Sequence, residues 1–191
     1  VITTVGGPGK LGYKKSWQID HSINRMIEEV MSEAEEDFIT YPFDIHGSDE
    51  RQYSSQGFRI NCATICKDRY YEYPEYHSSL DNLDFVTGKQ IALTFAMYLK
   101  VIEKIESRKI YKSRIPCGEV MLSQYGLYPS SGGAQRPDVQ GRSELDIILW
   151  ILFLCDGRKS LSDIALELKI DEASILPVVE RLVQKGVLEN V

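Results

Sequence analysis

Short apolar runs and helical stripes alternate along the first hundred residues. Apolar, β-branched runs predict strands over residues 1–5, 38–43 and 59–66. Apolar positions three and four residues apart predict a helix over 19–36 and a longer helix over 85–107. Strands that alternate with helices in this way predict an α/β domain with a sheet and flanking helices. The glycine-rich stretch between the first strand and the first helix reads as a plain turn.

Two of the expected strands are followed by loops rich in titratable side chains. The second strand leads into residues 44–58, and the third leads into residues 67–81, where His77 lies among acids and tyrosines. Active-site groups of α/β folds lie on loops at the carboxyl ends of strands. We therefore expect the two loops to converge. Taken alone, the second loop favours a helix N-cap segment with an incidental imidazole over a metal site, because a single histidine is a weak signal for a metal.

A second domain is expected after a connector. Residues 111–141 are rich in Gly, Ser and Pro, and they separate a first domain at 1–110 from a second at 142–191. Apolar periodicity predicts three helices in the second domain, with a tight turn between the last two, over 144–155, 161–168 and 171–185. This order is typical of a winged helix-turn-helix.

Charge argues against a nucleic-acid partner. The 191-residue chain has a net charge of −6, and residues 141–191 hold six Lys and Arg against nine Asp and Glu. The expected recognition helix begins with Asp171 and Glu172, which repel phosphate at the end that contacts DNA. A packing module, either within the chain or in a homo-oligomer, is favoured. No apolar run approaches the length that spans a bilayer, so no membrane partner is expected.

The cysteine spacing indicates a cellular location, and the first residues indicate that the chain is part of a longer protein. The four cysteines form no C-x2-C pair, which favours reduced, buried thiols and a cytoplasmic location over a structural zinc site. The chain opens without Met in an apolar run, so we expect it to be a piece of a longer protein.

Four motifs together resemble a known group. They are D-E-R-Q-Y at Asp49–Tyr53, Gly57–Phe58, E-Y-P-E-Y-H-S-S-L-D-N-L at Glu72–Leu83, and G-L-Y-P at Gly126–Pro129. With the helix-turn-helix that follows, the chain resembles bacterial proteins that carry a zinc-aminopeptidase-like domain and a winged helix, and that are associated with polysaccharide biosynthesis. The resemblance implies part of a zinc-exopeptidase-like mixed sheet and hydrolysis of a peptide or amide bond.

The resemblance also implies a role for His77. In the wider superfamily of zinc aminopeptidases, the histidine of this motif is the last zinc ligand, and the earlier ligands would lie outside these 191 residues. Where those peptidases have an Asp after a strand, this chain has Thr3 and Thr4. Asp49 or Glu50 is our candidate replacement as a metal ligand. The catalytic residues themselves are not identifiable.

Three further residues complete the expected site. Asp81 or Glu75 would accept the second N–H of the His77 imidazole. Arg51 would hold a substrate carboxylate, although a salt bridge to a neighbouring acid is an equal alternative. Two rival functions stay open, a protein that binds a ligand on the same fold without hydrolysing it, and a regulator that acts through its winged helix.

Overall fold

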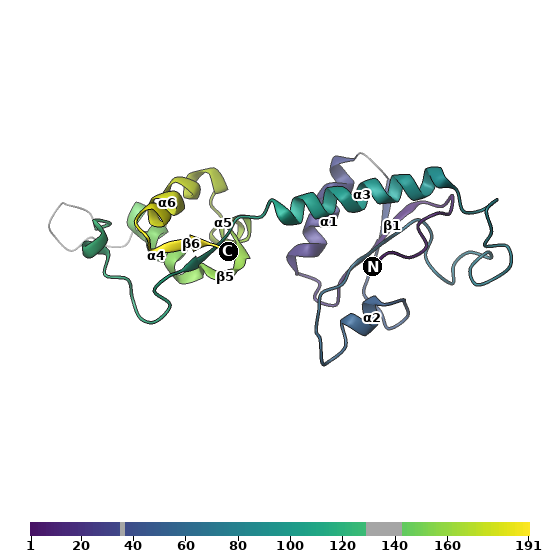
Figure 1. Ribbon diagram of the computed structural model, residues 1–191, viewed down its shortest axis with the longest axis horizontal. Coiled ribbons are helices and arrows are strands. Elements are labelled where there is room, and N and C mark those ends of the chain that lie inside the picture. The colour runs from purple at the N-terminus through teal and green to yellow at the C-terminus, as the bar shows by residue number, and fades with distance from the viewer. Residues whose placement is uncertain (35–36, 129–142) are drawn as a thin grey trace. The chain divides into compact units, whose positions relative to one another are not determined.

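The computed structural model describes residues 1–34, 37–128 and 143–191, and its contacts divide the chain after Ser107. The first unit is Val1–Ser107 and the second is Arg108–Val191 (Figure 1). Each unit has its own sheet and its own hydrophobic core. Among the described residues, no helix combines the length and the apolar character needed to cross a bilayer.

A mixed three-stranded sheet lies at the centre of the first unit. Its middle strand is β1 (Leu11–Lys14), which pairs in parallel with β2 (Phe38–Tyr41) and antiparallel with β3 (Thr64–Cys66). All four residues of β1 are buried. The sheet and its helices confirm the predicted α/β class.

The first residues of the chain extend this sheet without forming a regular strand. The amino group of Val1 donates to the Ala63 carbonyl at 3.0 Å, and the Lys67 amide donates to the Thr4 carbonyl at 2.8 Å. A single parallel bridge joins this segment to β3. The strand expected over 1–5 is therefore an extended edge beside β3.

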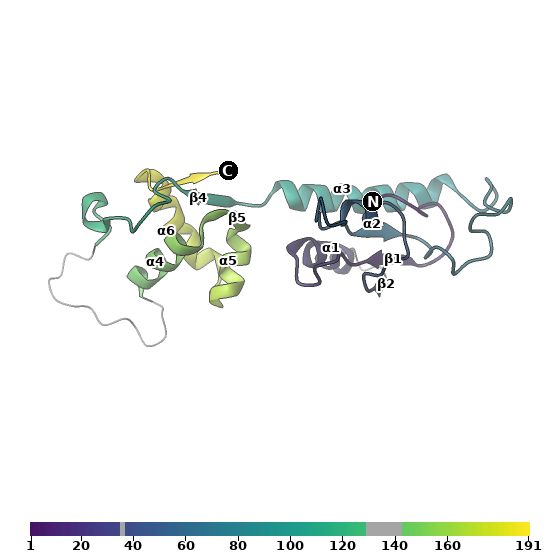
Figure 2. The same cartoon turned by 90° about the horizontal axis from the view of Figure 1, so that it is seen from below.

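Two long helices pack side by side against the sheet (Figures 1 and 2). The helices of this unit are α1 (Ser22–Glu33), the short α2 (Glu50–Tyr53) and α3 (Gly88–Glu106). Lys104 of α3 forms ion pairs with Glu29 and Glu33 of α1 at 2.8 and 3.0 Å. The buried core between helices and sheet consists of Leu11, Tyr13, Ile27, Val30, Met31, Ile65, Met97 and Val101.

Two local expectations differ from the structure. The glycine-rich stretch expected to be only a turn contains the start of β1, because a strand of four residues leaves too short a pattern to detect. The apolar pattern predicts that the long helix starts at residue 85. Instead the Thr87 side chain accepts from the Gln90 amide, and α3 begins after it.

The second unit is a winged helix-turn-helix, as predicted. Its central strand pairs antiparallel with both others, and three helices pack on the sheet (Figure 2). The elements in chain order are β4 (Ile110–Ser113), the 3-10 helix η1 (Leu122–Tyr125), α4 (Glu144–Leu154), β5 (Asp156–Ser160), α5 (Leu161–Leu168), α6 (Glu172–Gln184) and β6 (Leu188–Asn190). Both β4 and η1 come from the stretch expected to be a connector, and most of its remainder, 129–141, lies outside the described residues.

Local signals explain the helix-turn-helix. Ser160 and Asp163 form a reciprocal capping box at the start of α5, and Arg108 pairs with Asp163 at 2.8 Å. Lys169 ends α5 in the left-handed conformation with a φ of 55°. The turn into α6 therefore follows from residues that are visible in the sequence.

Candidate functional site

The two polar loops of the first unit meet at one cavity. It has a volume of about 500 Å³ and is bordered by the first residues of the chain, by Gly47 and Ser48 of the first loop, and by the second loop. The second loop contributes His77, Asp81 and a group of aromatic rings. The convergence expected from the strand ends is thus present.

His77 has an unusual backbone conformation. Its φ is 54° and that of Tyr71, in the same loop, is 69°, whereas most non-glycine residues avoid positive φ. The imidazole is stacked on the Tyr76 ring, with 4.0 Å between centroids. The loop therefore holds His77 at the exposed rim of the cavity by ring contacts and by a rare backbone geometry.

Aromatic rings line much of the cavity. Tyr71 packs edge-on against Tyr76 at 4.9 Å, Tyr73 packs edge-on against Tyr76 at 5.6 Å, and Tyr73 stacks on Phe85 at 5.5 Å. Burial, with smaller contributions from the nearby carboxylates of Asp81 and Asp68, raises the pKa of Tyr73 to about 12. Tyr73 therefore stays neutral at physiological pH, and it offers an apolar face and a hydroxyl group to the cavity rather than a charge.

Asp68 is the carboxylate that sequence reasoning missed. It follows β3 closely, lines the cavity, and accepts a hydrogen bond from the Gly9 amide at 3.3 Å. A Cβ on Gly9 would lie 1.5 Å from the Asp68 carboxylate, so this approach requires glycine. Burial raises the pKa of Asp68, and the Gly9 hydrogen bond only partly offsets that effect. The glycine-rich stretch that contains Gly9 was the feature of the sequence that could have indicated this close approach, but its pattern predicted only a turn.

Asp81 also lines the cavity, whereas Glu75 does not. In the part of the chain that the structure describes, neither carboxylate forms a hydrogen bond with the His77 imidazole. The expected orientation of His77 by one of them therefore remains a prediction.

Neither of the two acids expected to complete a metal site lines the cavity that His77 borders. Asp49 is exposed and precedes α2, and Glu50 is fully buried at its first position. The Glu50 carboxylate accepts from the Tyr70 hydroxyl at 2.7 Å, from the Lys14 ammonium at 3.1 Å and from the Ser48 amide at 3.1 Å. These partners already satisfy the carboxylate within the fold.

The surroundings of Glu50 favour the ionised form of its carboxyl group. Burial by itself would raise its pKa, but the hydrogen bonds from Tyr70 and Lys14 outweigh that effect and lower the pKa. The same burial and the bond to Glu50 raise the pKa of Tyr70. Glu50 is therefore an ionised carboxylate paired with Lys14.

Lys14 organises the first polar loop around its ammonium group. Besides Glu50, it donates to the Asp44 carboxylate at 3.0 Å and to the carbonyls of Asp44 and His46. A Cβ on Gly47 would lie 2.0 Å from the Glu50 carboxylate, so the loop can wrap this tightly only with glycine there. The buried cluster places Gly47 at the wall of the cavity.

Arg69 links the same cluster to the loop that carries His77. Its guanidinium bonds to Asp44 and to Glu72, each at 2.8 Å, and lies over the Tyr41 ring at 4.9 Å. Because Arg69 and Tyr70 are adjacent, both loops are fixed to β1 through one network of charges.

The Arg51 side chain bonds to the backbone of its own loop rather than lining the cavity. Its guanidinium donates to the Ile45 carbonyl at 3.3 Å, and the residue does not line the cavity. The described residues contain no ion pair between Arg51 and a neighbouring acid. The structure thus shows neither of the two roles expected for this side chain.

In the part of the chain that the structure describes, metal-ligating residues do not gather in sufficient number to form a site. Within residues 1–34, 37–128 and 143–191, no group of three or more His, Cys, Asp and Glu side chains is arranged to hold a metal ion. The cavity supplies His77 as one imidazole, with Asp68 and Asp81 elsewhere on its wall. These residues alone do not fit a complete zinc site.

Two family models match consecutive parts of the chain. The family model described as "Domain of unknown function (DUF4910)" matches residues 1–108, which cover all of the residues that line the cavity. The chain belongs to the DUF4910 family. A model described as winged helix-turn-helix matches residues 109–190, in agreement with the second unit.

Two similar proteins come from Clostridium acetobutylicum. The DUF4910 chain is 32% identical over 165 residues to a protein named "Putative polysaccharide biosynthesis protein with aminopeptidase-like domain". It is also similar, at 28% identity and a TM-score of 0.57 over its whole length, to a crystal structure described as that of a "putative peptidase". The chain spans 37% of the first protein and 41% of the second, less than half of either. A peptidase-like relationship follows from these similarities.

Proposed function

We propose that this chain is part of a zinc-dependent, aminopeptidase-like hydrolase that acts on a small substrate with a peptide or amide bond. The observation that carries the proposal is the position of His77, which the motif resemblance assigns as a zinc ligand and which lies at the rim of a cavity. Burial of Glu50 and the lack of a complete ligand set among the described residues support a site whose other ligands come from outside them.

The walls of the cavity favour a substrate with an amino group. The lining residues include the carboxylates of Asp68 and Asp81 and several aromatic faces, and none of them is Lys or Arg. Carboxylates and ring faces both attract an ammonium group. The Lys14 and Arg69 charges nearby are already engaged with Asp44 and Glu50.

Metal analysis with matched histidine variants tests the proposal. We expect the full-length protein that contains these residues to retain zinc stoichiometrically, and His77→Ala to lose it by about 10- to 100-fold in affinity or more. His46→Ala is the control, because His46 is exposed and does not line the cavity. A wild-type protein without zinc, or equal loss in both variants, would refute the proposal.

A ligand-binding protein without hydrolytic activity is the second candidate. It is favoured by the incomplete set of metal ligands among the described residues. Calorimetric titration with a peptide and its N-acetylated form separates the candidates when combined with an activity assay. Binding that requires the free amine, with no turnover in the zinc-loaded protein, would support the second candidate over the first.

A cytoplasmic location fits both candidates. All four cysteines are free thiols, and burial raises the pKa of Cys66 and Cys155 to about 12, which keeps them protonated.

A further inference from the structure

The cavity of the first unit holds a second group of side chains besides the expected metal ligand. Its volume of about 500 Å³ is that of a small-molecule site. Four aromatic rings and two carboxylates from the loop between β3 and α3 line it: Tyr71, Tyr73, Tyr76, Phe85, Asp68 and Asp81. We call these six residues the aromatic box.

The rings of the aromatic box form two walls that meet at a steep angle. Tyr73 stacks on Phe85 with 13° between the ring planes, and Tyr76 stacks on His77 with 16°. The planes of Tyr76 and Tyr73 differ by 71°, and Tyr71 packs edge-on against Tyr76. Ring walls at such an angle border a corner, as in the aromatic cages that hold quaternary ammonium groups.

The Asp68 carboxylate lies beside one of these walls. A Cβ on Gly7 would lie 2.2 Å from the carboxylate and 2.9 Å from the Phe85 ring, so the two groups come close together at this glycine. Burial is the main cause of the raised pKa of Tyr73, and the charges of Asp81 and Asp68 add to it. Negative charge therefore lies next to the rings, where it adds to the negative potential of their faces.

The carboxylates of the aromatic box lack a positive partner within the cavity. In the described part of the chain, neither Asp68 nor Asp81 forms an ion pair, and no Lys or Arg lines the cavity. The Gly9 hydrogen bond and the charge of Lys67 lower the pKa of Asp68, but burial outweighs them and the pKa stays raised. A cation bound beside Asp68 would supply the charge that is missing.

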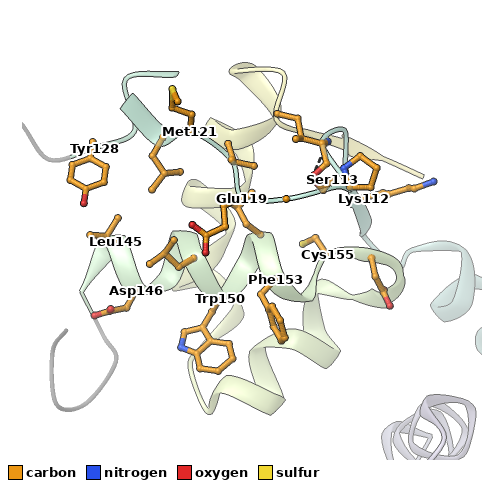
Figure 3. Close-up of a pocket in the computed structure, with 18 of the residues that line it drawn as sticks. Lys112, Ser113, Glu119, Met121, Tyr128, Leu145, Asp146, Trp150, Phe153 and Cys155 are labelled. Atoms are coloured by element: carbon orange, nitrogen blue, oxygen red, sulfur yellow. Dashed lines mark hydrogen bonds between the residues drawn. The ribbon is translucent and has the colours of Figure 1, made fainter. Parts of the chain in front are cut away.

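The larger cavity of the second unit has no such uniform charge. Its volume is about 1040 Å³, and its lining holds one lysine together with three acids, Lys112, Glu119, Asp146 and Asp156 (Figure 3). A lining of mixed sign does not select a ligand by its charge. Of the two cavities, the one in the first unit therefore favours a cation.

We propose that the aromatic box binds the positively charged ammonium group of the ligand through ring faces and carboxylates, and not through a metal. This inference rests on the proposed function for the reaction, but not for the binding step. Because ring faces and carboxylates recognise charge, the box accepts a fully methylated ammonium group as well as a primary amine. A fully methylated nitrogen has no lone pair to offer zinc, so the two ways of binding an amine can be told apart.

A matched pair of probes tests the proposal on the full-length protein. Choline and neohexyl alcohol, in which carbon replaces the nitrogen of choline, have nearly the same shape, but only choline is charged. We expect NMR titrations of their methyl resonances to give choline about 10-fold higher affinity or more, as for a desolvated cation against rings and a carboxylate. The preference should be the same with and without a chelator that removes zinc.

Two substitutions assign the preference to the aromatic box. Asp68→Asn keeps an oxygen that can accept the Gly9 amide, and Tyr73→Leu removes one ring of a wall. Each should lower the affinity for choline about 3- to 30-fold and change the affinity for neohexyl alcohol by less. Asp68→Asn decides by itself should Tyr73→Leu fail to fold.

The matched controls are Asp49→Asn and Tyr53→Leu. Both residues are exposed in or beside α2, and neither lines the cavity. They should leave the affinities for both probes unchanged, because they alter an acid and a ring outside the aromatic box.

Three outcomes would overturn the proposal. They are equal affinities for the two probes, a preference for choline that disappears with the chelator, and a preference that Asp68→Asn leaves intact. A protein that fails the zinc analysis but prefers choline would refute the proposed hydrolase and support the aromatic box. A zinc-dependent hydrolase with no preference for choline would refute the aromatic box alone.

Discussion

At the scale of single residues, the buried pair of Glu50 and Lys14 holds the first polar loop against β1. Both are buried, at 0% and 3% exposure, and they face each other at 3.1 Å among further hydrogen bonds. A buried ion pair contributes little net stability over an apolar pair, but loss of one partner leaves an uncompensated charge. The pair therefore fixes where the two loops lie.

Glu50→Ala should destabilise the first unit strongly. It leaves the Lys14 ammonium buried with one carboxylate fewer and removes the acceptor of Tyr70, so we expect a loss of about 3–5 kcal/mol in unfolding free energy. Urea denaturation measures it. Asp49→Ala, at the exposed neighbouring position, should change the free energy by less than about 0.5 kcal/mol. Similar losses for the two variants would contradict the structural role of Glu50.

The carboxyls of Asp68 and Glu50 should give opposite pH dependences of stability. The pKa of Asp68 is raised in the folded state, so its ionisation favours unfolding, and stability falls as pH rises through the range between the ordinary and raised values. The pKa of Glu50 is lowered, so its contribution is present above the ordinary glutamate value and is lost as pH falls through the lowered one.

Unfolding free energies measured from acidic to neutral pH should show both effects. Asp68→Asn should remove the fall in unfolding free energy that accompanies ionisation of Asp68 as pH rises. Glu50→Gln should remove the increase in unfolding free energy that accompanies ionisation of Glu50. If the two substitutions change the slope in the same direction, one of the two pKa assignments is wrong.

At the scale of elements, each unit contains one helix whose apolar surface is wider than its own core covers. In α3 the buried positions Met97 and Val101 lie beside Phe95 and Ile102, which are exposed. In α4 the most exposed apolar side chain is Phe153, at 78% exposure. Periodicity predicts such helices well, because it reports an apolar face, but it does not report what covers that face.

The helix-turn-helix is stabilised locally, and this can be tested at its first helix. Ser160→Ala removes both hydrogen bonds between the Ser160 hydroxyl and Asp163, and we expect a loss of about 1–2 kcal/mol. Thermal unfolding should show the change in the transition of the second unit. Ser174→Ala, an exposed serine in α6, should have no comparable effect. A shift in the transition of the first unit instead would contradict the division of the chain.

At the scale of the whole molecule, the chain joins a cavity-bearing α/β unit to an acidic winged helix unit. The start of α6, with Asp171 and Glu172, lacks the positive charge that DNA readers place there. Helix α4 of the same unit instead carries exposed apolar side chains, among them Trp150 and Phe153.

The sequence by itself determined the α/β class, the helix-turn-helix and the importance of the two polar loops. Those features depend on periodicity, on capping residues such as Ser160, and on motif spacing, all of which are local. Only the tertiary structure decided that Glu50 is held by Lys14, that Asp68 faces the cavity, and that Arg51 does not. These outcomes depend on contacts between residues far apart in the chain, 36 positions for Lys14 and Glu50, where burial and pairing are set by packing.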